Sequence, residues 1–414
     1  MSDVLAICAA AKAASRALAR TSTATRDAVL EAMAARIDGA HDPILAANAQ
    51  DVDAGEQAGV SSAMLDRLRL DADRLRAISA GLRDLIDFAD PLGRIVRGFT
   101  LPNGLDVRQV TVPLGVIAMV YEGRPNVTVD AAGLAIKSGN ACVLRGSSSA
   151  ILSNSALAEL LRAAVVDCGL LADVISLVTD TSRDSVKQLG RARGLVDLLI
   201  PRGGAGLIQA VVSDSQVPVI ETGVGNCHVY VDRSADQQMA VAIVRNAKAQ
   251  RPSVCNAAET LLVHRDIAAQ FLPKVADALT AAGVRLRGDE PTRAYIDAEP
   301  AQDADWDTEY LDLTLAVAVV DDLDGALAHI ARHGTLHTEA VVTQDRAVAR
   351  RFVTEVDAAA VMVNASTRFT DGGEFGFGAE IGISTQKLHA RGPMGLAELV
   401  TTKYIVDGDG QIRQ

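Results

Sequence analysis

LGVIAMVY, residues 114–121, is an almost unbroken apolar run with the length of one β-strand. A strand that is apolar on both faces is typical of a parallel sheet covered by helices on both sides. The pattern then becomes that of a helix over residues 128–137, and the next apolar run, residues 141–144, again has the length of a strand. Strands that alternate with helices at this spacing predict a doubly wound parallel sheet.

The same alternation continues downstream and forms two α/β units. In the first unit, further strands are expected at residues 174–178, 196–200 and 219–221, with helices at 150–168 and after Gly206. In the second unit, strands are expected at 229–231, 260–263, 315–319 and 340–342, with helices at 236–247, 266–282 and 324–331. The chain is therefore expected to contain two parallel sheets.

The segments outside these units have other patterns. Residues 1–92 repeat apolar side chains at intervals of three and four, which predicts helices. Residues 94–112 contain two alternating stretches around Asn103-Gly104, a pair typical of a hairpin turn, and residues 399–406 form one more alternating strand. Because an exposed hairpin edge is prone to pair with another chain, we expect a partner subunit to cover it, and hence a homo-oligomer.

Composition excludes several classes of protein. The chain has 414 residues, 49% of them apolar, which allows two or three globular domains. A net charge of −12 argues against nucleic acid or an anionic membrane as a partner. Five scattered Cys predict neither a disulfide framework nor a metal site, and no apolar run is long enough to predict a transmembrane helix. We therefore expect a cytoplasmic protein without a bound metal.

Polar loops follow several of the expected strands, at the sheet edge where parallel sheets bind ligands. Residues 122–126, 145–149, 201–204 and 222–226 are such loops. Small residues let backbone N–H groups approach a phosphate, although each loop taken alone also suits an ordinary turn. The G-x-G-x-x-G pattern is absent, which disfavours a standard Rossmann pyrophosphate site.

Cys255 is a candidate nucleophile. It lies among small and polar residues just before an apolar strand, and the cations Arg245, Lys248 and Arg251 precede it. The thiolate is the reactive form of cysteine, and neighbouring cations lower the pKa of the thiol. The alternative is that Cys255 is a small buried apolar residue, the commonest environment of a free cysteine.

The order of these motifs resembles that of the aldehyde dehydrogenase superfamily, and within it the gamma-glutamyl phosphate reductases. The resemblance covers nearly the whole chain. It rests on the phrases YEGRPN (121–126), IPRGG (200–204), ETGVGNCH (221–228), HTEA (337–340) and GFGAEIGIST (376–385).

The resemblance implies an aldehyde-dehydrogenase-like α/β fold with two doubly wound parallel-sheet domains and a small β element for oligomerisation. A cofactor-binding domain would comprise residues 1–92, 113–228 and about 355–393. A catalytic domain, residues 229–354, would carry the nucleophilic Cys255. The oligomerisation hairpin and tail strand would be residues 93–112 and 394–414.

The resemblance also implies reduction of L-glutamyl 5-phosphate by NADPH to L-glutamate 5-semialdehyde and phosphate, through a thioester on Cys255. Asn126 and the Cys255 backbone N–H would stabilise the oxyanion. Glu221 matches the general base of hydrolytic relatives. Because water attack would waste the thioester, the role of Glu221 stays open between proton handling, orientation of the thiol and structural support.

Binding residues follow from the same resemblance. Arg145, Ser147 and Ser148 form a loop without an acidic residue, which suits the 2′-phosphate of NADPH. The other candidate cofactor-binding residues are Gly203, Gly204 and Glu309, although Glu309 also suits a solvated surface. The candidate substrate-binding residues are Glu122, Arg124, Ser366, Thr367 and Arg368.

Two other functions remain open. A hydrolytic or CoA-acylating aldehyde dehydrogenase would use the same Cys255. A catalytically silent paralogue would bind nucleotide or a partner, but it would be expected to have lost the nucleophile, Asn126 or the glycine turns, and all are present. Association with glutamate 5-kinase, the enzyme that makes the substrate, is a further possible partnership.

Overall fold

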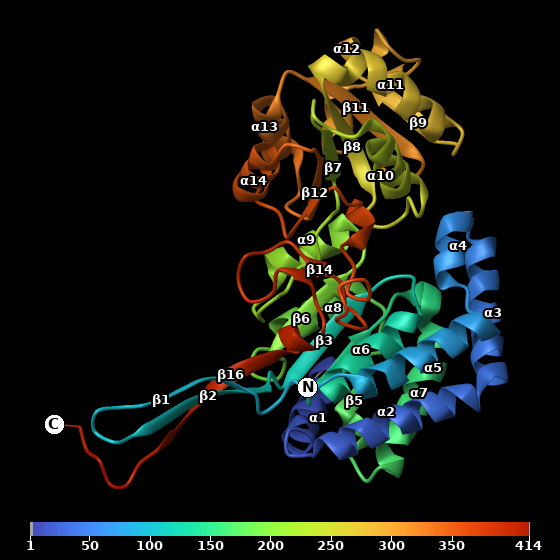
Figure 1. The fold of residues 1–414 in the computed structure, drawn as a ribbon. Coiled ribbons are helices and arrows are strands. Elements are labelled where there is room, and N and C mark those ends of the chain that lie inside the picture. Colours follow the sequence, from blue (N-terminus) through green and yellow to red (C-terminus); the bar gives the residue numbers. More distant parts are fainter. Residues whose placement is uncertain (1–2, 414) are drawn as a thin grey trace. The chain divides into compact units, whose positions relative to one another are not determined.

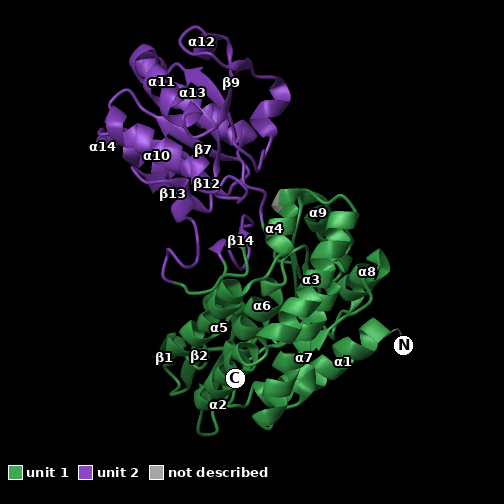
Figure 2. Cartoon of the chain, turned by 90° about the vertical axis from the view of Figure 1, so that its right-hand side faces the viewer, with its two compact units in different colours: residues 1–222, 377–382, 394–414 green, residues 223–376, 383–393 purple. Residues whose placement is uncertain are grey.

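The computed structural model describes residues 3–413, which form two compact units. Unit 1 contains the described residues up to Thr222, together with residues 377–382 and 394–413 (Figure 2). Unit 2 contains residues 223–376 and 383–393. Each unit is built around its own parallel sheet, as the sequence predicts.

The parallel sheet of unit 1 has the strand order β5-β4-β3-β6. Its strands are β3 (Val116–Tyr121), β4 (Ala141–Arg145), β5 (Ile175–Leu177) and β6 (Leu198–Arg202). The strand expected at 219–221 is not formed, and Val219 makes only an isolated bridge with Leu199. The pairing stops there because the chain leaves the sheet and passes into unit 2 after Thr222.

Helices cover both faces of this sheet. One face packs against α1 (Asp3–Leu18), α8 (Arg183–Arg191) and α9 (Ala205–Asp214). The other face packs against α6 (Asn126–Lys137) and α7 (Ile151–Asp167). Beyond these lie α2 (Thr23–Asp38), α3 (His41–Gln57), α4 (Ser62–Leu68) and α5 (Ala72–Asp87). Among the described residues, Ser148–Asp167 alone is long and apolar enough to cross a membrane, but helices α2, α3 and α6 pack against it as a core helix.

A three-stranded antiparallel sheet extends from the helices of unit 1 as an arm (Figure 1). It contains the predicted hairpin, β1 (Ile95–Thr100) and β2 (Asp106–Pro113), and the tail strand β16 (Val400–Asp407). Gly104 has a φ of 86°, a left-handed conformation that favours glycine in the turn. The arm exposes large apolar side chains, including Ile95, Val96, Phe99 and Val406.

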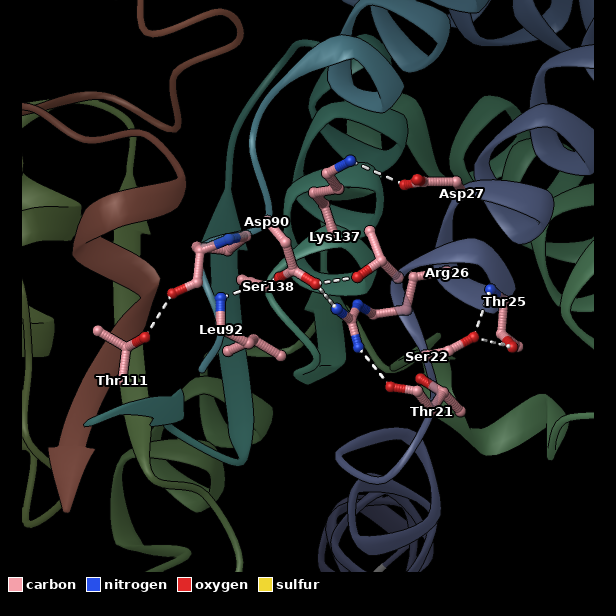
Figure 3. Close-up of polar contacts among 12 residues, drawn as sticks. Thr21, Ser22, Thr25, Arg26, Asp27, Asp90, Leu92, Thr111, Lys137 and Ser138 are labelled. Carbon is pink, nitrogen blue, oxygen red and sulfur yellow. Dashed lines mark hydrogen bonds and ion pairs between the residues drawn. The ribbon is translucent and has the colours of Figure 1, made fainter. Parts of the chain in front are cut away.

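Buried polar contacts hold the root of this arm (Figure 3). The carboxylate of Asp90 accepts hydrogen bonds from Arg26 and Thr23 of α2, and also from the backbone N–H of Leu92 at 2.9 Å. The Arg26 side chain is only 3% exposed. At the far side of the root, the Thr111 hydroxyl donates to the Pro91 carbonyl at 2.7 Å. The chain therefore leaves α5 in a fixed direction.

The parallel sheet of unit 2 has the strand order β10-β9-β11-β8-β7-β12-β13. Four strands correspond to predicted ones: β7 (Cys227–Val231), β8 (Ala258–His264), β11 (Thr314–Val320) and β12 (Thr338–Val342). The other three are β9 (Arg285–Gly288), β10 (Glu299–Pro300) and β13 (Ala360–Val363). Because β13 pairs with β12, the segment up to residue 376 belongs to unit 2. The expected grouping of residues 223–228 and 355–393 with the first domain is therefore wrong except for residues 377–382, which belong to unit 1.

Alternate residues of these strands face different helices. Val229 and Val231 pack toward α10 (Gln237–Ala249) and α11 (Arg265–Thr280). Tyr230 packs on the other face, toward α13 (Leu323–His333) and α14 (Arg346–Glu355). The other α-helix of unit 2, α12 (Glu290–Arg293), is short, as are the strands of the antiparallel pair β14 (Ile383–Ser384) and β15 (Gly392–Pro393). Two short 3-10 helices, η3 (Asp303–Asp307) and η4 (Thr367–Phe369), also belong to unit 2.

The contact at the arm root predicts a stability effect. Arg26→Met should lower the free energy of unfolding by about 3 kcal/mol, because it removes the buried cation that pairs with Asp90. The matched control is Arg36→Met, which breaks the exposed pair with Asp167 and should cost less than about 1 kcal/mol. Urea denaturation of both variants measures the difference, and equal losses would contradict the role given to Arg26.

Candidate functional site

A pocket of about 580 Å³ opens in unit 1 at the carboxyl ends of β3 and β4. The charged residues that line it are Glu122, Arg145, Arg183, Lys187 and Asp214, and its hydroxyl-bearing residues include Ser147 and Ser148. A pocket at this edge of a parallel sheet is the usual place for a nucleotide. Candidate cofactor residues of two loops, 145–148 and 203–204, lie at or beside it.

Arg145 is buried, and its guanidinium donates hydrogen bonds to other groups of the protein. It donates to the carbonyls of Thr181 and Ser182, the latter at 2.8 Å, and to the Ser185 hydroxyl at 3.2 Å. Burial lowers the pKa of Arg145. Arg145 therefore fixes the loop that leads into α8.

Two cations that the sequence reasoning did not single out line the same pocket. Arg183 and Lys187 are both exposed and lie four residues apart on α8. Residues four apart in a helix project from the same face. This spacing, directly after a predicted strand, was the sequence signal that could have identified them.

Glu122 also belongs to the pocket wall. Its carboxylate accepts the backbone N–H of Gly204 at 3.0 Å. A Cβ at Gly203 would collide with this carboxylate, so the close approach requires glycine. Ser147, on the neighbouring loop, accepts the N–H of Gly123 at 3.3 Å. Glu122, expected to bind the substrate amino group, thus lies with the candidate cofactor residues.

Asn126 is the first residue of α6, immediately after the β3 loop. Its Nδ2 donates to Oδ2 of Asp130, one turn further on, at 2.8 Å. Burial raises the pKa of Asp130 to about 6, while the hydrogen bond from Asn126 and the charge of Arg202 oppose that rise. Asp130 was not anticipated from the sequence. Unit 1 also contains the candidates Arg124 and Glu221, both partly exposed.

Cys255 lies in unit 2, in the loop that joins α10 to β8. It is partly exposed, whereas Cys8, Cys142 and Cys227 are buried, which argues against the buried apolar alternative. The Sγ of Cys227 donates to the Cys255 carbonyl at 3.2 Å. A Cβ at Gly225 would overlap that carbonyl, so two neighbouring segments fix the backbone of the nucleophile loop.

Glu309 is tied to the same place. Its Oε1 accepts the backbone N–H of Gly225 at 2.9 Å, so the carboxylate is anchored beside the residue that packs on Cys255. Lys248, expected as a cation near the thiol, is instead fully buried in an ion pair with Glu259. It is therefore not a cation that a ligand or the solvent reaches.

Arg368 is a cation close to the Cys255 loop. Its Nε donates to Oε1 of Gln250 at 2.7 Å, and the two side chains Arg368 and Cys255 interact electrostatically. Asn256 also donates to the Thr370 carbonyl at 2.8 Å.

The neighbouring candidates Ser366 and Thr367 are buried, and the Ser366 hydroxyl accepts the N–H of Arg368 at 3.3 Å. Unit 2 thus brings Cys255, Glu309 and the 366–368 segment into one cluster.

Known proteins resemble the chain over its full length. Residues 1–294 match the aldehyde dehydrogenase family. A gamma-glutamyl phosphate reductase of Thermobifida fusca (strain YX) is 58% identical over 412 residues, 99% of either chain. A gamma-glutamyl phosphate reductase of Moorella thermoacetica is 58% identical over 405 residues, 98% of this chain and 97% of the relative.

Solved structures agree with these relatives. The crystal structure of gamma-glutamyl phosphate reductase from Thermotoga maritima superimposes with a TM-score of 0.97 at 44% identity, and all of both chains is covered. An acetylating aldehyde dehydrogenase from Geobacillus thermoglucosidasius, 18% identical, shares the fold with a TM-score of 0.72, covering 100% of this chain and 98% of the other. The chain therefore belongs to the aldehyde dehydrogenase family, in the branch of the gamma-glutamyl phosphate reductases.

Proposed function

We propose that the protein reduces L-glutamyl 5-phosphate with NADPH to L-glutamate 5-semialdehyde and phosphate, the second step of proline biosynthesis from glutamate. The observation that carries the proposal is the partly exposed Cys255 in a loop fixed by Gly225 and Cys227, in a chain 58% identical to relatives with that name. A cytoplasmic location, where thiols stay reduced, suits this chemistry.

Cys255 is the proposed nucleophile. Its thiolate forms an S–C bond to the acyl carbon, and the C–O bond to phosphate breaks, so phosphate leaves with the electron pair. NADPH supplies the hydride that reduces the resulting thioester. The S–C bond of the thiohemiacetal then breaks, which releases the semialdehyde and returns the thiolate. Arg368 is proposed to stabilise the thiolate, because its charge interacts with Cys255.

The oxyanion formed at each addition needs hydrogen-bond donors. We assign this role to the Cys255 backbone N–H and to the side-chain amide of Asn126. An amide nitrogen carries two hydrogens, and the bond to Asp130 uses one of them. Asp130 therefore orients the amide and leaves one N–H for the oxyanion. Glu221 is proposed to handle the thiol proton, since activation of water would hydrolyse the thioester.

The pocket of unit 1 fits the phosphate-bearing end of NADPH. Arg183 and Lys187 provide two exposed cations for the 2′-phosphate, and Ser147 and Ser148 provide hydroxyls. Arg145 would contribute indirectly, because it holds the loop that leads into α8, the helix that carries both cations. Gly204 donates its N–H to the carboxylate of Glu122, which lines this pocket. Glu309, anchored by Gly225, is proposed to bind the ribose of the nicotinamide.

The arm is the proposed oligomer contact. The edge strand β1 is exposed along its whole length and carries Ile95, Val96 and Phe99 on its surface. An apolar strand edge of this kind pairs readily with another chain. We propose that a second copy of the chain covers it.

Cys255→Ala should abolish turnover, because no thioester can form, while NADPH binding stays near the wild-type value. The assay follows NADP⁺ reduction by glutamate semialdehyde in the presence of phosphate, and cofactor binding is measured by fluorescence titration. Turnover that survives the substitution would exclude the thioester mechanism. Wild-type activity that needs CoA or water in place of phosphate would instead favour one of the other aldehyde dehydrogenase activities.

Gly225→Ala should lower kcat at least about 100-fold, because the added Cβ displaces the Cys255 carbonyl and with it the nucleophile loop. Gly81→Ala on α5 is the matched control, since an added Cβ there meets no atom within 4 Å, and its kcat should be unchanged. Far-ultraviolet circular dichroism verifies that both variants fold. Full activity in Gly225→Ala would contradict the close packing at Cys255.

Lys187→Glu should raise the KM for NADPH at least about tenfold, because a carboxylate then faces the 2′-phosphate, and it should leave the KM for NADH nearly unchanged. Arg191→Glu is the matched control on the same helix, because Arg191 is exposed and does not line the pocket. Steady-state kinetics with both cofactors gives the comparison. Parallel changes in the two KM values would place the 2′-phosphate elsewhere.

A further inference from the structure

Arg202 ends β6 and has no role in the steps above. We propose that Arg202 binds the phosphate group of the acyl phosphate, a phosphoryl dianion, and so serves as the anchor for the leaving group. The assignment rests on the proposed function. Three points support it: the position of Arg202, the absence within residues 3–413 of a hydrogen-bond or ion-pair partner for its side chain, and the chemistry of phosphate release.

The backbone holds Arg202 firmly at the ligand edge of the unit 1 sheet. Arg202 pairs with Tyr121 in the parallel ladder, and its carbonyl accepts the Glu122 N–H at 3.1 Å. The preceding carbonyl, that of Pro201, accepts the Thr222 hydroxyl at 3.0 Å. Arg202 therefore lies between the end of β3, which leads to Asn126, and the segment that contains Glu221.

The guanidinium lies close to a glycine of the 376–385 motif. A Cβ at Gly382 would be 3.2 Å from Nη1 of Arg202 and 2.6 Å from Cγ2 of Thr222. Glycine at this position therefore gives the guanidinium room beside Thr222. Arg202 does not line the 580 Å³ pocket, so its position differs from that of Arg183 and Lys187.

The charge of Arg202 is not neutralised by a direct partner. Within residues 3–413, no hydrogen bond or ion pair of its side chain is found, and the side chain is partly exposed. The carboxylate of Asp130 lies within electrostatic range, yet it accepts from Asn126 rather than from Arg202. A guanidinium in this state can bind an anionic ligand through two N–H groups, the geometry that suits phosphate.

The reaction places phosphate next to the group that Asn126 binds. In an acyl phosphate, the phosphoryl oxygen and the carbonyl oxygen are attached to the same carbon. Asn126 is assigned to the carbonyl oxygen. Asp130 accepts a hydrogen bond from Asn126, and the charge of Arg202 acts on the same Asp130 carboxylate. As the C–O bond breaks, negative charge grows on the phosphate, and a nearby guanidinium stabilises that charge.

The test uses the reverse reaction, in which inorganic phosphate attacks the thioester. Glutamate semialdehyde and NADP⁺ are held at saturation, and inorganic phosphate is varied for the wild type and for Arg202→Met. The KM for phosphate should rise at least about tenfold, which corresponds to about 1.4 kcal/mol. The KM values for NADP⁺ and semialdehyde should change less than about twofold. Arsenate, as a phosphate analogue, should show the same shift.

Two further variants frame the result. Arg36→Met, which removes a surface arginine paired with Asp167, should leave all three KM values unchanged. Arg202→Lys keeps the positive charge but loses the planar guanidinium that binds phosphate through two N–H groups. It should therefore raise the KM for phosphate by a smaller factor than Arg202→Met. If Arg202→Met fails to fold, as judged by circular dichroism, the Arg202→Lys variant decides the question.

Each outcome has a distinct meaning. A wild-type enzyme that turns over without phosphate would overturn the proposed function itself. A phosphate-dependent wild type with an unchanged KM for phosphate in the Arg202 variants would overturn only the role of Arg202. A rise confined to the KM for NADP⁺ would assign Arg202 to the cofactor, and a rise confined to the KM for semialdehyde would assign it to the substrate carboxylate. Both would contradict the phosphate assignment.

Discussion

The backbone packing of Gly225 against Cys255 is the constraint on which the proposed chemistry depends. A thioester mechanism needs a thiol at the surface of its unit and a backbone N–H held in one orientation. Gly225 leaves no room for the Cys255 carbonyl to move toward it, and the Cys227 thiol donates to that same carbonyl. Because Gly225 also donates to Glu309, the nucleophile loop and the candidate nicotinamide-binding carboxylate share one support.

The candidate functional residues are distributed over both units, close to the parallel sheet of each. In unit 1, Asn126 follows the end of β3, Arg202 ends β6, and the pocket cations lie on α8. In unit 2, the loop before β8 presents Cys255. Asn126 and Arg202 lie where strands end, and Cys255 lies shortly before a strand begins, so a sheet fixes the backbone close to each of them while the side chain can meet a ligand.

Much of the fold was predictable from the sequence, because the longer buried parallel strands are apolar runs. LGVIAMVY and the strands that follow it were found for this reason. The strands β9, β10 and β13 were missed because they are short, and β9 is partly polar. Residues 219–221 have the composition of a strand but make a single bridge, since the chain leaves the sheet there.

The sequence predicts a site residue well when the residue type itself carries the chemistry. It predicts a residue's role less well when that role depends on its hydrogen-bond or ion-pair partners. The sequence identified Cys255 and Asn126 as candidates. It did not show that Arg145 is occupied by the loop before α8, that Lys248 is paired with Glu259, or that Asp130 holds Asn126. Such assignments depend on contacts between segments far apart in the chain, which local patterns do not encode.

The most direct test of the central claim is to trap the covalent intermediate. The wild-type protein is incubated with glutamate semialdehyde and NADP⁺ without phosphate, quenched in acid and digested, and the cysteine peptides are examined by mass spectrometry. If Cys255 forms the thioester, the peptide that contains it should gain the mass of one glutamyl group, and this gain should be lost when phosphate is added before the quench. NADP⁺ reduction without an adduct on Cys255, or with an adduct on another cysteine, would contradict it.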